Sequence, residues 1–355
     1  MSNLDPNAIL RGAQLTVVGA YRALQNPKLF NSTLYRQAAI AIAAGFAIRV
    51  LISIPLLVVR IALFFVGFVV DLQKSQWDEK FLSSLSFLEK SVLQLPFFLM
   101  SLYRFVSPAM DEMFMKSLEW VDSTYIRKHQ SEDPTTLRAM YYPNMRLYQP
   151  NAPSPGALQG EKSSSQLVLA FAQRYTRRAA ISLGVYLLTF TPYLGHYVLP
   201  AASFYSLNEA VGSGPASGVF ALGLILPKRW MIVILQGFFA SRSLMRELLE
   251  PYFSRIRFTK EQKKRWFRDR QGLLFGFGVG FYLLLKVPLL GVLIYGIAEA
   301  STAYLITKIT DPPPPPSESE GFAESQVAWK NQKEFLTLDL AHLDKLNADD
   351  GSKKQ

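Results

Sequence analysis

The chain has 355 residues, of which 50% are apolar or aromatic, and its mean hydropathy is positive at +0.13. Only 18% of its residues are charged, against about 25% in soluble domains, which argues against a soluble multidomain protein. The formal net charge is +11, and the absence of cysteine excludes disulfides, thiol nucleophiles and thiolate metal sites.

Residues 1–33 are expected to form an N-terminal amphipathic helix at a membrane interface. Asn26 and Pro27 would end this helix. A helix packed on the protein's own membrane body fits the same pattern. Apolar residues recur at helical spacing at Ile9, Ala13, Val17, Tyr21 and Leu24.

A first membrane block is expected over residues 34–107. Its apolar stretch, residues 38–70, would measure about 50 Å as one helix, whereas the hydrocarbon core of a bilayer is about 30 Å thick. Pro55 lies near the middle of this stretch. The stretch is therefore either one long, tilted and kinked helix or a hairpin that returns to its starting side.

A second membrane block is expected over residues 167–310. Its shorter apolar pieces, residues 179–199 and 218–240, suit half-penetrating helical hairpins as well as full spans. Its last stretch, residues 272–306, is again over-long and contains Pro288 near its middle. Small residues four positions apart predict one helix face for close packing: Gly272, Gly276 and Gly280.

Two segments are expected to lie outside the membrane blocks. Residues 108–166 are interpreted as a polar connector that ends in a loop, because turn-forming residues crowd its end in "NAPSPGALQGEKSSS". Residues 311–355 are interpreted as a Pro-rich, acidic cytosolic tail whose five consecutive prolines hold the rest away from the membrane. Beyond the prolines, residues 325–346 either form a short helix or are disordered.

The densest positive charge lies between residues 255 and 270, directly before the last apolar stretch. Its aromatic neighbours also suit nucleic-acid binding, but the adjacent membrane block disfavours that partner. Basic side chains beside a membrane helix attract anionic headgroups with about 1 kcal/mol each, and they also fix topology by the positive-inside rule. We therefore predict a lipid-headgroup site made by eight cations: Arg255, Arg257, Lys260, Lys263, Lys264, Arg265, Arg268 and Arg270.

A second group of charges lies inside apolar sequence. Arg49 and Arg60 are 11 residues apart, which places them on nearly one face of a helix, and Lys286 interrupts the last stretch. Ionisable groups at membrane depth pair with one another or line a polar path. These three residues are the candidates for a small-anion path; alternatively, they snorkel or are neutralised by Glu209 and Glu299.

No catalytic or metal site is predicted. His129, His196 and His342 have no partner at metal-ligand spacing, and no nucleophile elbow or paired-carboxylate motif is present. We expect neither an enzymatic activity nor a cofactor.

The segment "RFTKEQKKRWFRDRQGLLFGFGVGFYLLLKVPLLG", within residues 238–310, resembles the fungal transmembrane protein UsgS family. More distantly it resembles the outer-spore-wall and lipid-droplet proteins of yeasts, and the superfamily of the etoposide-induced protein and the bacterial sulfate permease CysZ. The resemblance implies an all-α integral membrane bundle with long kinked helices and half-penetrating hairpins, in endoplasmic reticulum or lipid-droplet membrane.

Two functions follow from the residues and the resemblance together. The first is a non-enzymatic membrane protein that organises lipids or partners at the surface of the endoplasmic reticulum or of lipid droplets, with both termini in the cytosol. The second is a transporter or channel for small anions such as sulfate. Membrane lipids with anionic headgroups are the expected partners, nucleic acid is not, and homo-oligomerisation is left open.

Overall fold

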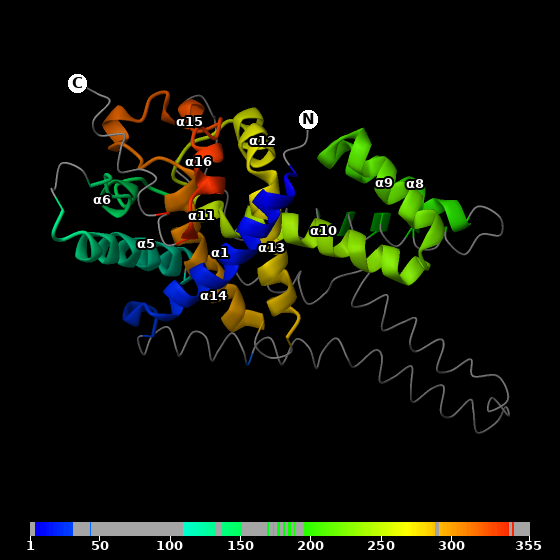
Figure 1. The fold of residues 1–355 in the computed structure, drawn as a ribbon, viewed down its shortest axis with the longest axis horizontal. Helices are drawn as coiled ribbons and strands as arrows, with labels where there is room; N and C mark the ends of the chain where they lie inside the picture. Colours follow the sequence, from blue (N-terminus) through cyan, green and yellow to red (C-terminus); the bar gives the residue numbers. More distant parts are fainter. Residues whose placement is uncertain are drawn as a thin grey trace. The chain divides into compact units, whose positions relative to one another are not determined.

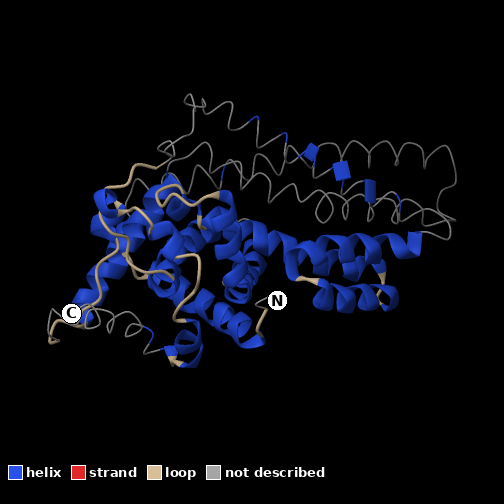
Figure 2. Cartoon of the chain, turned by 90° about the horizontal axis from the view of Figure 1, so that it is seen from above, coloured by secondary structure: helices blue, strands red, loops and turns tan. Residues whose placement is uncertain are grey.

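The computed structural model describes residues 4–30, 109–132, 137–150, 195–287 and 291–340, with isolated positions at 43, 343 and between 169 and 188. All regular elements in these ranges are helices, as Figure 2 shows, so the predicted all-α class is confirmed for them. The chain divides into two compact units. One unit combines residues 1–37, 108–161 and 240–355, and the other combines residues 38–107 and 162–239.

The first unit is built from helices that are far apart in sequence (Figure 1). It also includes residues 240–248, the end of α10, whose earlier residues belong to the second unit. Its elements are α1 (Pro6–Leu24), η1 (Pro27–Phe30), α5 (Ala109–Lys128), α6 (Tyr142–Met145), α10 (Lys228–Leu248), α11 (Glu250–Phe253), α12 (Lys260–Asp269), α13 (Gln271–Leu285), α14 (Gly291–Ile309), η5 (Pro316–Glu318), α15 (Phe322–Ser325) and α16 (Gln332–Thr337).

The over-long apolar stretch 272–306 forms two helices, α13 and α14, which contact each other (Figure 1). Arg270, just before α13, donates from Nε to the carbonyl of Ile309 at the end of α14, at 3.0 Å. The start of one helix therefore lies beside the end of the other, so this stretch is an antiparallel hairpin and not one long kinked helix. The corresponding stretch of the first block lies outside the described residues, apart from Ala43.

Within the part of the chain that the structure describes, none of the helices combines the length and the apolar character needed to cross a membrane.

Helix α1 packs against α13 and α14 (Figure 1). Most of its buried residues are small. A Cβ atom added at Gly276 would lie 2.8 Å from the carbonyl carbon of Ile9, and one at Gly280 would lie 2.5 Å from Oγ1 of Thr16. The structure thus places two of the three predicted packing glycines at a close helix contact, and it buries Gly272 as well. Asp5 begins α1 by accepting a hydrogen bond from the Asn7 N–H.

Within the predicted polar connector, residues 109–128 form the helix α5. Its buried residues Phe114, Leu118, Val121 and Tyr125 recur at helical spacing, and α5 packs against α14. The turn residues on which the interpretation depended lie further along, beyond the end of this helix. The connector therefore contributes a core helix to the first unit.

The tail folds back onto the first unit instead of extending away from it. The carbonyls of Pro313 and Pro314 accept hydrogen bonds from Nδ2 of Asn144 and from the hydroxyl of Tyr148, at 2.8 and 2.7 Å. Proline lacks an N–H but keeps its carbonyl acceptor, so an extended proline run still has groups that can bind a neighbour. Beyond the prolines, where the sequence predicts either a short helix or disorder, the structure has two short helices, α15 and α16, and Phe335 is buried.

The second unit contains a pair of short helices, α8 (Gly195–Val211) and α9 (Ser213–Ile225), followed by the start of α10. Gly212 joins the pair with φ +91°, a conformation that favours glycine. The rings of Phe204 and Phe220 meet edge to face at 6.1 Å. Residues 195–225 thus form a helical pair.

Candidate lipid-contact site

The basic helix α12 begins at a capping box. Thr259 accepts a hydrogen bond from the N–H of Gln262 at 3.2 Å, and the Gln262 side chain accepts one from the N–H of Thr259 at 2.9 Å. These bonds satisfy backbone groups that the first turn of a helix leaves unpaired. The local sequence therefore fixes where the helix starts.

Trp266 anchors α12 to the body of the protein. Its side chain is fully buried, and its ring meets that of Phe253 edge to face at a centroid distance of 5.0 Å. A helix with one side held by a large buried ring presents its other side outward. The same aromatic cluster also contains Tyr252, Phe258 and Phe267.

Four of the eight predicted cations lie on the outward side of α12, and Arg257, just before the helix, is exposed as well. Lys263 is half-buried and pairs with Glu250 at 3.1 Å, which reduces the charge it offers to a ligand. We define the α12 cation surface as the five exposed residues Arg257, Lys260, Lys264, Arg265 and Arg268.

The other two predicted cations are buried, which corrects their assignment to a headgroup site. Arg255 is 6% exposed and binds Asp111 of α5 through both terminal nitrogens, at 2.6 and 2.7 Å. Arg270 is 2% exposed. Both guanidinium groups bind inside the protein, because a buried charge needs partners that replace water.

Arg270 binds three backbone carbonyls at once. Nε donates to Ile309, Nη1 to Val327 and Nη2 to Gln326, at 3.0 to 3.1 Å. Burial lowers the pKa of its guanidinium to about 10, still far above neutral pH. A single charged side chain therefore joins the base of the α13–α14 hairpin to the tail.

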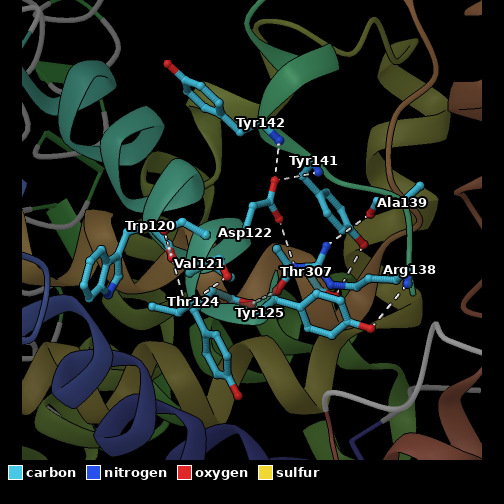
Figure 3. Close-up of polar contacts among 12 residues, drawn as sticks. Trp120, Val121, Asp122, Thr124, Tyr125, Arg138, Ala139, Tyr141, Tyr142 and Thr307 are labelled. Carbon is cyan, nitrogen blue, oxygen red and sulfur yellow. Dashed lines mark hydrogen bonds and ion pairs between the residues drawn. The ribbon is translucent and has the colours of Figure 1, made fainter. Parts of the chain in front are cut away.

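A second polar cluster lies between α5 and residues 138–142 (Figure 3). The carboxylate of Asp122 accepts from Nη2 of Arg138 at 2.9 Å and from the N–H groups of Tyr141 and Tyr142 at 2.8 and 2.7 Å. The hydroxyl of Tyr141 donates to the carbonyls of Thr307 and Thr310, and burial raises its pKa.

This cluster is suited to a structural role. Asp122 and Arg138 are 4% and 3% exposed and bind each other, so neither offers a free group to a substrate. Sequence reasoning missed the cluster because its partners are 16 to 20 residues apart, across the segment interpreted as a connector.

Of the three residues proposed for an anion path, Lys286 alone lies among the described residues. Lys286 is exposed at the end of α13, with its ammonium 4.6 Å from the ring centroid of Tyr282. Arg49, Arg60 and the side chain of Glu209 lie outside the described residues, and Glu299 is fully buried.

Histidine and carboxylate side chains also fail to gather at a metal-binding geometry anywhere in the described residues. Nδ1 of His129 lies 2.9 Å from Glu132, whereas the side chains of His196 and His342 lie outside the described part.

Comparison with known proteins gives one family match. Residues 216–295 match the family described as sulfate transporter CysZ/etoposide-induced protein 2.4. The match is to a membrane-protein superfamily. It covers less than a quarter of the chain and includes α12 and α13, so it supports the wider part of the resemblance but not the nearer one to fungal UsgS or spore-wall proteins. No curated protein and no solved structure matches the chain.

Proposed function

We propose that this chain is a non-enzymatic membrane protein that organises anionic lipids through the α12 cation surface. The observation that carries the proposal is the exposure of five cations, four on α12 and Arg257 just before it, where α12 is anchored by Trp266 and followed directly by apolar α13. Each exposed cation near an anionic membrane surface contributes about 1 kcal/mol of attraction. The family match to membrane proteins supports the same placement.

The proposed location is the endoplasmic reticulum or the lipid-droplet surface, with both termini in the cytosol. The support is the resemblance of residues 238–310 to fungal droplet and spore-wall proteins, together with the positive-inside rule applied to α12. Fluorescence localisation with droplet staining tests this location. A signal confined to the plasma membrane would contradict it.

The headgroup contact is tested by measuring which lipids gather around the full-length protein. The protein is assembled into nanodiscs from phosphatidylcholine and phosphatidylserine, and mass spectrometry measures the phosphatidylserine fraction against that of empty nanodiscs. We expect enrichment with the native protein, and less enrichment at high salt because salt screens exposed charges. A variant with all five residues of the α12 cation surface changed to Gln should lose the enrichment.

A matched control variant distinguishes a local effect of the α12 cation surface from an effect of the protein's net charge. It replaces five other exposed cations of the first unit by Gln: Arg127, Lys128, Arg146, Lys330 and Lys333. Both variants lose the same charge, so only a local headgroup contact predicts that the first loses enrichment and the second keeps it. Equal behaviour of the two would count against the proposal.

The second candidate function is passage of a small anion, favoured by the printed description of the matched family as a sulfate transporter. The proposed path residues remain Arg49, Arg60 and Lys286. Liposomes containing the protein should then admit labelled sulfate faster than empty liposomes, and Lys286→Gln should slow the entry. Equal entry into both kinds of liposome would exclude this function.

A further inference from the structure

The outward face of α1 carries no charge and, apart from Gln14, is apolar. Its most exposed large side chains are Leu10, Val17, Tyr21 and Leu24, at 61%, 70%, 62% and 50% exposed. They recur along one side of the helix over about 21 Å. We define the α1 outer face by these four residues together with the exposed Ala13 and Gln14 between them.

Both arginines of α1 lie beside this face and not on it, and Nη1 of Arg11 donates to Oε1 of Gln14 at its edge, at 3.5 Å. Arg11 donates from Nη2 to the carbonyl of Leu336 in the tail at 3.3 Å, and the guanidinium of Arg22 lies 4.8 Å from the ring centroid of Tyr304 in α14. Every exposed position of α1 is therefore uncharged. Interfaces with soluble partners are enriched in Arg, and no exposed position of α1 is an Arg.

The side-chain sizes on α1 are reversed relative to a helix of a soluble protein. The buried face carries Ala8, Gly12, Gly19 and Ala23 beside Thr16 and a single large apolar side chain, Leu15, whereas four large apolar side chains face outward. Small residues inside and large apolar residues outside are the arrangement of helices surrounded by lipid, because hydrocarbon solvates large apolar side chains and small ones allow helices to approach.

A second exposed apolar group lies at the far end of the hairpin on which α1 packs. Leu283, Leu284, Val287 and Leu293 are 40% to 60% exposed. All four lie within the residues that match the membrane family. One apolar medium, lipid hydrocarbon, accounts for both exposed groups.

We propose that the α1 outer face contacts the acyl chains of the bilayer, so that α1 is a lipid-facing helix seated on the α13–α14 hairpin. This inference rests on the proposed membrane location but not on the α12 cation surface. Burying Leu, Val and Tyr side chains in hydrocarbon supplies the driving force, and the small-residue contact with α13 holds the helix in place.

The chain contains no cysteine, so single cysteines can be labelled without a background. A nitroxide is attached to Val17→Cys or Tyr21→Cys in full-length protein in vesicles of phosphatidylcholine and phosphatidylserine. Its collisions with lipid-soluble oxygen and with a water-soluble nickel chelate are compared. Leu284→Cys serves as the membrane reference and exposed Glu324→Cys as the aqueous reference.

We expect the ratio of oxygen to nickel accessibility at positions 17 and 21 to be several-fold above that at 324 and similar to that at 284. A water-like ratio at 17 and 21 with a lipid-like ratio at 284 overturns this inference alone. Low accessibility to both reagents at 17 and 21 means that protein covers the face, which also overturns it. A water-like ratio at 284 as well overturns the proposed membrane function together with the inference.

Discussion

Nε of Arg270 lies 3.0 Å from the carbonyl oxygen of Ile309, and this hydrogen bond spans 39 residues of sequence. Ile309 is the last residue of α14, where helix carbonyls have no intrahelical partner and the helix dipole favours a cation. The same guanidinium also binds two carbonyls of the tail. Arg270 therefore closes the hairpin and attaches the tail with one side chain.

Replacing Arg270 by Met should destabilise the protein and release the tail. Three carbonyls lose their donor, two of them in buried hydrogen bonds, and leaving a buried carbonyl unpaired costs about 1–3 kcal/mol before relaxation. We expect a lower thermal midpoint and faster tryptic cleavage after Lys330. Arg268→Met removes an exposed neighbour and should change neither; an unchanged cleavage rate in Arg270→Met would show that Arg270 does not hold the tail.

Gly276→Ala should disrupt the contact between α1 and α13. The new methyl group would meet the backbone of Ile9, which cannot move aside as a side chain can, and overpacking of this kind costs about 1–3 kcal/mol. Gly214→Ala is the matched control, because a Cβ atom there meets nothing within 4 Å. In a helix this second change should be neutral or slightly stabilising. Equal unfolding midpoints for the two variants would contradict the close contact.

Asp122 and Arg138 should behave as a coupled pair. Removing one partner leaves the other charge buried, which costs about 3–5 kcal/mol. Asp122→Ala and Arg138→Met should each be strongly destabilising, and the double variant should be destabilised by much less than the sum. A double-mutant cycle measured by chemical unfolding gives the coupling energy, and strict additivity would refute the pairing.

Tyr141 should make the protein less stable at alkaline pH. Burial raises its pKa in the folded state above the ordinary value of 10.0, so above pH 10 the unfolded chain loses a proton that the folded chain keeps. Stability from this group is complete below pH 10 and falls as the pH rises further. Thermal midpoints measured across this range should fall less steeply in Tyr141→Phe than in the native protein. Parallel slopes would mean that Tyr141 does not contribute.

The helical elements were largely accessible from the pattern of residues. Apolar spacing predicted α1, glycine spacing predicted the face of α13 that contacts α1, and the over-long stretch with a central proline allowed the hairpin. Helix α5 could have been found too, since Phe114, Leu118, Val121 and Tyr125 carry the same helical period. The turn residues that follow this helix in the sequence favour a loop, and they obscure its helical period.

Which cations are buried and which are exposed could not be predicted from the residue pattern. Arg255 and Arg270 belong to the same basic run as Arg257 and Arg268, and their neighbours are similar in composition. They are buried because their partners, Asp111 and the tail carbonyls, come from distant parts of the chain. Pairs between such distant residues cannot be predicted from the local sequence.

The choice of which face of α1 packs on the protein also depended on the tertiary structure. The sequence placed the large apolar residues Val17 and Tyr21 on one helix face. Both interpretations of this face, contact with a membrane or with the rest of the protein, put it against apolar surroundings. In the structure the opposite face, with Gly12 and Gly19, packs on the hairpin.

The sequence by itself determined that the chain is helical, apolar and basic, because helical periodicity and side-chain hydropathy are local properties. Only the tertiary structure decided which cations of residues 255–270 face outward and which face of α1 is covered. Those outcomes depend on contacts between segments up to several hundred residues apart, such as the contact of Arg11 with the tail. The free energy of such contacts cannot be predicted from a local sequence pattern.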